Sequence, residues 1–344
     1  MLDKVAIVVL NWNGWQDTVE CLESLFQVKY DNFQVIVVDT GSTDGSIAKI
    51  KEWAKGNIDV KSKYVKFDPK NKPISCQEVA SSTLKEKGKA KKDNATLVLI
   101  RSEENLGFAR GNNIGIRYAL EELDVEYIML LNNDIAVKAD FLEKLVRRFN
   151  IDPEAAMVAP MAADYETGWL RNYPAIKRYN FLAYLTGLTP LNRILWKYSV
   201  FMIRLLRRFN APTKVYLVGG FCMLFKKKVL VEIGLYDEAT FLGWEEFIIA
   251  EKLLKLGYST YFIPDSIVYH KIGQSTKKMP SVEKAVAFLE SEKYFQDNYF
   301  KMPRLQMFFI RLVRFFFYSI QSLFNRPYRK NFMRVSRAIF GAKG

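Results

Sequence analysis

Short apolar runs alternate with amphipathic stretches over the first 150 residues of the chain. The apolar runs predict buried strands at residues 5–10, 35–39, 96–100 and 127–131. The stretches between them repeat apolar positions at helical spacing and predict helices at residues 15–27, from about 43, at 109–121 and at 139–149. This order predicts an α/β fold in which a mostly parallel sheet carries helices on both faces. Ligands are expected at the carboxyl ends of such strands.

The pattern is looser in the second half of the chain. A strand-like run covers residues 215–225, a helix is predicted at residues 244–256 with Gly257 as its cap, and an extended segment follows at residues 261–270. We therefore expect an α/β domain over residues 1–275 and a separate helical tail over residues 276–344.

Two segments inside the first domain break the alternation. Residues 61–92 hold ten lysines against three acidic residues, and they are expected to form a solvated, mobile insertion. Residues 171–214 hold nine basic residues and no acid, and they are interpreted as a basic amphipathic insertion.

The net charge of +14 calls for an anionic partner. Residues 301–344 contribute ten lysines and arginines and no acid, interleaved with phenylalanines. Nucleic acid phosphates need positive charge but gain little from large apolar side chains, so this mixture favours an anionic membrane surface over nucleic acid.

The tail shows helical spacing. One stripe of the expected helix is polar and the remainder is apolar; the stripe consists of Arg304, Arg311, Arg314, Tyr318 and Gln321. A membrane-spanning helix would bury Arg311 and Arg314 at a cost of roughly 2.5 to 3.5 kcal/mol each, so a helix lying in the interface is expected. Residues 191–209 repeat the pattern. Packing of these helices on the first domain, or a homo-oligomer interface, remains the alternative.

The three cysteines are odd in number, far apart and without a C-x-x-C pair, which excludes a disulfide framework or a cysteine zinc site. The first apolar run is too short for a signal-peptide core. Together with the basic tail, these features predict a cytoplasmic protein, peripheral on the inner face of the cell membrane.

Three polar segments follow predicted strands. Asp39 ends the second strand and is followed by a turn of small residues, so it could bind a base or ribose or could simply order the turn. Residues 104–113 combine glycines with Asn and Arg, which suits a diphosphate, although such a loop alone is weak evidence. Residues 132–134, Asn-Asn-Asp, suit a divalent metal and phosphate site or an ordinary strand-to-helix cap.

Taken together, these segments resemble the family-two glycosyltransferases of GT-A fold, and in particular their bacterial rhamnosyltransferase-like branch. The resemblance covers roughly residues 4–275 and rests on motifs in a fixed order. These are the runs at residues 9–14, 37–46, 105–115, 132–134, 219–221, 236–238 and 244–246, and the single histidine, His270.

The resemblance implies a role for each matching residue. The nucleotide would be bound by Asn11, Asp39 and Ser42, and the diphosphate or sugar by Asn105, Arg110, Asn113 and Asn132. Asn132 and Asp134 stand at the family's Asp-x-Asp motif, whose first carboxylate is absent here. Asp134, the donor diphosphate and His270 would hold Mg²⁺ or Mn²⁺. One member of the pair Glu245 and Glu246 would be the general base, and position in the motif favours Glu246.

The reaction implied is a single inverting displacement from a dTDP- or UDP-sugar to a hydroxyl of a lipid-linked glycan, in cell-surface polysaccharide synthesis. Two rivals stay open. A sugar nucleotidyltransferase uses a similar scaffold, but residues 11–14 lack the basic residue of its phosphate loop. A catalytically silent, membrane-bound scaffold would explain the incomplete metal motif.

Overall fold

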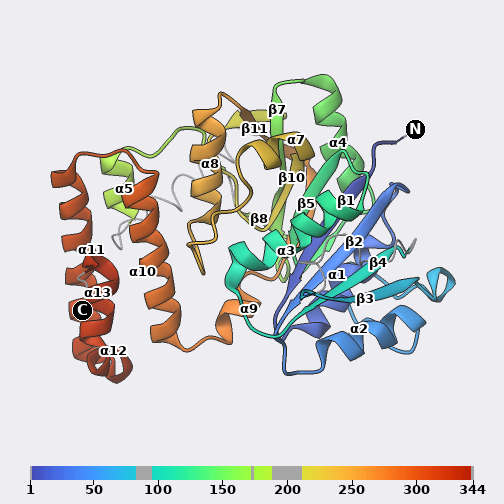
Figure 1. The fold of residues 1–344 in the computed structure, drawn as a ribbon, viewed down its shortest axis with the longest axis horizontal. Helices are drawn as coiled ribbons and strands as arrows, with labels where there is room; N and C mark the ends of the chain where they lie inside the picture. Colours follow the sequence, from blue (N-terminus) through green and yellow to red (C-terminus); the bar gives the residue numbers. More distant parts are fainter. Residues whose placement is uncertain (1, 83–94, 172–173, 188–210, 342–344) are drawn as a thin grey trace.

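A mixed sheet forms the centre of the computed structural model, which describes residues 2–82, 95–171, 174–187 and 211–341. Within these residues the sheet has 11 strands, and nine of them lie in the order β3-β4-β2-β1-β5-β10-β7-β11-β6 (Figure 1). The strands are β1 (Val5–Asn11), β2 (Phe33–Thr40), β3 (Cys76–Ala80), β4 (Leu97–Ser102), β5 (Tyr127–Asn132), β6 (Ile135–Val137), β7 (Ala155–Asp164), β8 (Leu170–Arg171), β9 (Thr213–Val215), β10 (Cys222–Lys226) and β11 (Ser259–His270).

The half of the sheet that is formed by residues 5–132 is parallel. Strands β3, β4, β2, β1 and β5 pair in parallel, whereas β10 is antiparallel to both β5 and β7. The helices are α1 (Trp15–Leu25), α2 (Ser46–Lys55), α3 (Gly107–Glu122), α4 (Phe141–Ile151), α5 (Phe181–Gly187), α7 (Lys227–Glu232), α8 (Glu245–Lys255), α9 (Gln274–Lys277), α10 (Ser281–Asn298), α11 (Arg304–Phe324), α12 (Arg326–Lys330) and α13 (Phe332–Phe340), with a 3₁₀ turn at Pro69–Asn71. The predicted α/β fold with a mostly parallel sheet is confirmed.

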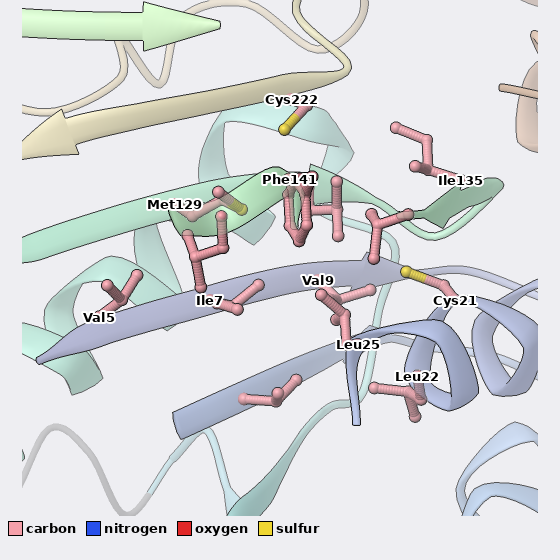
Figure 2. Packing of buried hydrophobic residues seen from close by; sticks show 14 of the residues in the cluster. Val5, Ile7, Val9, Cys21, Leu22, Leu25, Met129, Ile135, Phe141 and Cys222 are labelled. Atoms are coloured by element: carbon pink, nitrogen blue, oxygen red, sulfur yellow. The ribbon is translucent and has the colours of Figure 1, made fainter. Parts of the chain in front are cut away.

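The alternation of side chains along β1 supplies both cores of the domain. Val5, Ile7 and Val9 face the cluster under α1 and α4, which Figure 2 shows from close by. Ala6 and Val8 face the opposite cluster under α3. Because successive side chains of a strand point to opposite faces, one continuous apolar run serves two hydrophobic layers.

The glycines of α3 serve helix packing. A Cβ atom at Gly115 would lie 2.4 Å from Val8 Cγ1, and one at Gly111 would lie 2.5 Å from Leu10 Cδ1. Both glycines therefore let α3 lie directly on β1. The expectation that the glycines of residues 104–113 open the backbone to a ligand is wrong for Gly111.

The lysine-rich segment is only partly as expected, and its residues 83–92 lie outside the described residues. Its earlier part is built into the domain, because β3 pairs in parallel with β4 at the edge of the sheet. Lys72 Nζ lies 3.0 Å from Glu23 Oε2, and both side chains are almost fully buried. The buried Glu23 carboxylate and the pairing of β3 with β4 thus hold residues in the domain that composition alone assigns to solvent.

The strand-like run at residues 215–225 is also corrected. Strand β9 ends at Val215 and β10 begins at Cys222, and the two pair with different neighbours, β11 and β5. Gly219 and Gly220 lie between them and have no strand assignment. The expected helix at residues 191–209, and most of the insertion at residues 171–214, fall outside the described residues.

Helices α10 to α13 form a layer at one end of the molecule, beside α5 and α8 (Figure 1). Helix α10 packs against α12 and α13 through a hydrophobic cluster of its own, made of Val282, Ala285, Val286, Leu289, Tyr328, Val335, Ala338 and Ile339. Of the helices in the described ranges, α11 is the one long and apolar enough to cross a membrane by length and composition, and 11% of its most apolar window is buried.

Arg311 and Arg314, in the middle of the polar stripe of α11, face the protein, whereas Arg304 and Gln321 are exposed. Arg311 Nε donates to Gln296 Oε1 at 3.0 Å, and Arg314 binds both carboxylate oxygens of Glu292 at 2.9 and 3.0 Å. Residues 301–344 contain no acidic residue, so the acidic partners of these arginines come from the preceding helix α10. The large apolar side chains that stay exposed on α11 are Leu305, Phe308, Phe309, Leu312, Phe316, Ile320, Leu323 and Phe324.

Candidate active site

A cavity of about 220 Å³ opens at the carboxyl ends of β1, β2 and β5, where the parallel sheet predicts a ligand site. Loops that precede α3 and α8 close it on one side, and the end of β11 closes it on the other. Its lining residues are Leu10, Trp12, Thr40, Asn105, Gly107, Phe108, Asn132, Asn133, Asp134, Phe241, Leu242, His270, Gly273 and Met279.

The predicted nucleotide-binding side chains lie together behind this lining. Asn11 Nδ2 donates to Asp39 Oδ2 at 2.5 Å and to Ser42 Oγ at 3.2 Å. The Ser42 backbone N–H closes the turn on Asp39 Oδ1 at 3.1 Å. Asn11 and Asp39 are buried, and their polar atoms bind one another. In this arrangement Asp39 orders the turn, and the cavity itself is lined by the neighbouring Leu10, Trp12 and Thr40.

Of the predicted residues in the glycine-rich segment, one lines the cavity and two contact residues 236–238. Asn105 lines the cavity, and its Oδ1 accepts from the Gly107 backbone N–H at 3.0 Å. Arg110 points away, and its Nε donates to the Glu238 carbonyl at 3.0 Å. The buried Asn113 side chain binds the backbone of Tyr236 and the Glu238 carboxylate. Neither Arg110 nor Asn113 lines the cavity, because the helical register of α3 turns both side chains from it. Their contact with a diphosphate stays a prediction.

Asp134 and His270 meet at the cavity wall. Asp134 Oδ1 lies 3.2 Å from His270 Nε2, and the two side chains are 6% and 9% exposed. Neither atom has a partner with hydrogen-bond geometry among the described residues. Burial would raise the pKa of Asp134, but the adjacent His270 outweighs it, so the pKa lies below its ordinary value. Asn132, the residue at the start of the same turn, lines the cavity beside them.

This pair fits a divalent cation in part. A carboxylate oxygen and an imidazole nitrogen are both ligands of Mn²⁺-type ions, and here both are buried without other partners. No group of three or more ligating side chains occurs in the described residues. A cation at Asp134 and His270 would therefore take its remaining ligands from a bound diphosphate and water.

The segment after His270 is fixed to the domain by an ion-pair network. Lys271 Nζ lies 2.6 Å from Asp17 Oδ1 and 2.5 Å from Glu20 Oε2. The Lys271 backbone N–H donates to the Asp134 carbonyl at 3.0 Å. Burial lowers the pKa of Lys271, but the two carboxylates outweigh it and raise the pKa overall. The network holds the strand end that carries His270 against α1, and nothing in the local sequence pattern signals it.

Glu245 and Glu246 stand at the start of α8, beyond the cavity wall made by Phe241 and Leu242. Glu245 is buried with its Oε1 unpartnered, and burial followed by the charge of Glu246 raises its pKa to about 8. Glu246 is half-buried, and burial raises its pKa as well. A carboxyl group whose pKa lies near the working pH is well suited to take a proton.

A glycine pair connects these glutamates to the metal-type pair. A Cβ atom at Gly220 would lie 3.6 Å from Glu246 Oε2, so this carboxylate lies against the 219–221 backbone. The ring of Phe221 lies 5.2 Å from the ring of His270, and its carbonyl accepts from the Asn132 backbone N–H at 2.8 Å. The structure thus brings Glu246, His270 and Asn132 to one short segment.

Much of the apolar lining escaped the sequence motifs. Trp12 and Phe108 lie inside the motif runs 9–14 and 105–115, but the polar residues of those runs, and not these aromatic side chains, were predicted to bind a ligand. Phe241, Leu242 and Met279 lie in loops without a local pattern, and they reach the cavity through the fold alone.

Comparisons with known proteins identify the family and the fold to which this chain is similar. A sequence model of the family described as Glycosyl transferase family 2 matches residues 6–74 and 81–234. The dTDP-rhamnosyl transferase RfbF of Shigella flexneri is 27% identical over 185 residues, which are 53% of this chain and 54% of that protein. The low-salt glycan biosynthesis hexosyltransferase Agl10 of Haloferax volcanii is 26% identical over 147 residues, 43% of each chain. The chain thus spans about half the length of these curated relatives.

Two solved structures share the fold. GalNAc-T7, solved with UDP, GalNAc and Mn²⁺, has a TM-score of 0.54 at 16% identity and covers 87% of this chain and 49% of its own. The mannosyltransferase PcManGT from Pyrobaculum calidifontis, solved with GDP-Man and Mn²⁺, has a TM-score of 0.50 at 16% identity and covers 98% and 86%. At this identity they establish the GT-A fold, as the sequence predicts.

Proposed function

The chain belongs to glycosyl transferase family 2, and on this basis we propose that it moves a sugar from a nucleotide diphosphate donor, a dTDP- or UDP-sugar, to a glycan hydroxyl with inversion. One observation carries the proposal. At the cavity wall, Asp134 Oδ1 and His270 Nε2 meet without a hydrogen-bond partner among the described residues. Beyond the wall made by Phe241 and Leu242 lies a pair of glutamates whose pKa values are raised.

The strand ends would bind the donor. The turn that Asp39 orders fixes Thr40 and Trp12 at the cavity, where a base or ribose would lie. Asn105 and Asn132 present amide groups further along the wall toward Asp134. Mg²⁺ or Mn²⁺, when bound at Asp134 and His270 with the diphosphate, would neutralise charge on the leaving group.

The glutamates would act on the acceptor. Glu246 is the more accessible of the two, and it lies against Gly220, next to Phe221, whose ring contacts His270. These contacts support Glu246 as the general base. Burial raises the pKa of Glu246, which gives this carboxylate a higher proton affinity than an exposed glutamate has. Attack of the acceptor oxygen opposite the leaving diphosphate inverts the anomeric carbon in one step.

The rivals are less well supported. A nucleotidyltransferase would need a basic phosphate loop where residues 11–14 have none. A silent scaffold would not require a buried carboxyl group with an unpartnered oxygen, which costs stability without a compensating role. The first carboxylate of the metal motif is missing, but His270 lies beside Asp134 and offers a second ligand. A scaffold would not need this contact.

We further propose that the acceptor is lipid-linked and that the chain works on the inner face of the cell membrane. The exposed apolar face of α11 offers a surface for the lipid interface. Exposed basic side chains lie on the same helical layer, among them Arg304, Arg326, Arg329 and Lys330, and residues 301–344 contain no acid. This charge complements anionic lipid headgroups and disfavours burial of the face against a second copy, which would bring like charges together.

A ligand screen tests the proposed function. Thermal unfolding of the purified chain would be followed with UDP, dTDP and GDP compounds, each with and without Mn²⁺. A ligand that binds the native state raises the melting temperature, and at least one nucleotide diphosphate is expected to do so more strongly with metal. Slow release of nucleoside diphosphate from the matching sugar donor would support the transferase, and no release from any donor with any metal would support the scaffold.

A further inference from the structure

The loop before α8 adopts a backbone that its surroundings must hold in place. Trp244, which directly precedes Glu245, has φ of +72°, in the left-handed region that a bulky residue rarely occupies. Such a conformation persists only where packing fixes it. The rings packed around Trp244 come from α5, α8 and α10, with centroid separations of 4.6 to 5.7 Å; they belong to Tyr184, Phe247, Phe288 and Phe295.

Helix α10 touches this loop directly. A Cβ atom at Gly243 would lie 2.6 Å from Phe288 Cδ2, so the backbone of the loop lies against that ring. Two hydroxyl groups near the end of α10, those of Tyr294 and Tyr299, also donate to Asp237 Oδ2, with the Tyr294 bond at 2.8 Å. The C-terminal layer therefore holds the segment that leads to the glutamates at both of its ends.

A buried polar chain extends this contact to α11. Arg314 binds both oxygens of Glu292, whose side chain is 3% exposed. Glu292 Oε1 accepts from the Tyr184 hydroxyl at 2.7 Å. The Tyr184 ring then stacks on Trp244, with centroids 5.5 Å apart and planes 14° apart. Each link is directional, because bidentate ion pairs, hydroxyl bonds and stacked rings all constrain orientation.

We propose that the chain Arg314–Glu292–Tyr184 is a positioning device that holds Trp244, and through it the glutamate pair, in the geometry for proton removal. The C-terminal helices thus complete the acceptor side of the active site in addition to facing the membrane. Arg314, Glu292 and Tyr184 are positioning residues and do not touch the reacting atoms. This inference rests on the proposed function, since it assumes that the glutamates act as base.

Kinetics separate positioning from plain structural support. A residue that only stabilises the fold changes the folded fraction and leaves the kinetic constants of the folded molecules unchanged. A positioning residue lowers kcat and spares donor binding, because the donor is held by strand ends on the far side of the cavity.

The test uses the full chain with Tyr184→Phe, which keeps the stacked ring and removes the hydroxyl, and with Arg314→Gln and Arg314→Lys. Arg334→Gln is the matched control, because it breaks a 3.3 Å pair with Glu283 at the surface of the same layer. Hydrolysis of dTDP-rhamnose and UDP-glucose would be measured per folded molecule, together with binding of dTDP and UDP in the presence of Mn²⁺.

We expect kcat to fall by about tenfold to a hundredfold in Arg314→Gln and less in Tyr184→Phe, with partial recovery in Arg314→Lys and nucleotide affinity unchanged. Values of kcat equal to those of Arg334→Gln in both Tyr184→Phe and Arg314→Gln would overturn the inference while leaving the transferase intact. Absence of hydrolysis by the wild-type chain with every donor would instead overturn the proposed function, and this inference with it.

Discussion

The strand ends and the C-terminal helices hold their polar groups by different means. At the strand ends, Asn11, Asp39 and Ser42 bind one another across the neighbouring strands β1 and β2, so the donor side is built from short segments with backbone support. On the other side, the glutamate loop is held by side chains from α5, α10 and α11. We therefore expect the first arrangement to tolerate changes in the C-terminal helices, whereas the second depends on them.

This contrast gives the two sides separable sensitivities. Changes at the glutamates should alter turnover and spare the donor, and changes at the Asp134–His270 pair should alter metal-dependent donor binding. The following substitutions test whether the sides are as independent as the contacts indicate.

The largest effect is expected from Glu246→Gln. The amide cannot accept the acceptor proton, so kcat should fall by about 10²- to 10⁴-fold while nucleotide affinity stays within a factor of about two. Glu245→Gln is the control, measured by the same donor turnover and nucleotide titration. Small and equal losses in the two variants would remove this pair from catalysis.

Substitutions of Asp134 and His270 should give a smaller effect, and they should change metal-dependent nucleotide binding instead of turnover. Asp134→Ala and His270→Ala each remove one of two adjacent protein donors. The Mn²⁺ concentration needed for half-maximal nucleotide binding should rise by about tenfold or more. Isothermal titration of the nucleotide at several Mn²⁺ concentrations measures this shift. Full activity of the wild type in excess chelator would contradict it and assign leaving-group stabilisation to side chains alone.

A pH experiment probes the buried carboxyl. The pKa of Glu245 is about 8 in the folded chain, above its ordinary value of 4.5, so the folded state holds the proton more tightly than the unfolded state does. Its contribution to stability is therefore complete below about pH 4.5 and is lost as the pH rises through about 8. Glu245→Gln should flatten the fall in unfolding free energy between pH 5 and 8, by an amount on the order of a few kcal/mol.

Urea unfolding at both pH values measures this change, and Glu121→Gln, an exposed position on α3, serves as the reference. If the wild type and Glu245→Gln show the same pH slope, then the carboxyl is not buried in solution as described.

The smallest effect concerns the outer face of α11. Phe308→Ser with Phe316→Ser removes two side chains that are 52% and 60% exposed, and binding to anionic vesicles should weaken by about tenfold. Val231→Ser with Leu254→Ser changes two equally exposed apolar residues on α7 and α8 and should leave binding unaltered. Co-sedimentation at low and high salt measures both, and equal recovery of the two double variants with the vesicles would remove this face as the contact.

The sequence patterns locate the strand ends at the cavity well because these elements are local in the chain. The strands and the polar residues that end them are adjacent in the chain, so Asp134 and Asn105 could be placed at the cavity in advance. The sequence could not show that Arg110 and Asn113 turn away from the cavity, because the direction of a side chain on α3 depends on how that helix is rotated against β1. The surroundings of the tail helix were missed for a related reason. Helical spacing identified the stripe with Arg311 and Arg314, but it could not show that α10 would supply the acidic partners.

The glutamate loop illustrates the remaining limit. Its motif was found, but the support of Trp244 by Tyr184 and Phe288 joins segments separated by more than forty residues, and no periodicity encodes such a contact. Contacts between rings that lie this far apart in the chain can be recognised only once the fold is known.

The central claim, inverting sugar transfer, is tested most directly by the configuration of the released sugar. Proton NMR of the wild-type chain with its donor and Mn²⁺, recorded in the first minutes before mutarotation, would identify the anomer formed with water as acceptor. We expect release of the sugar with the anomeric configuration opposite to that of the donor. A first-formed anomer with the donor's configuration, or no release from any nucleotide sugar that binds, would contradict the account.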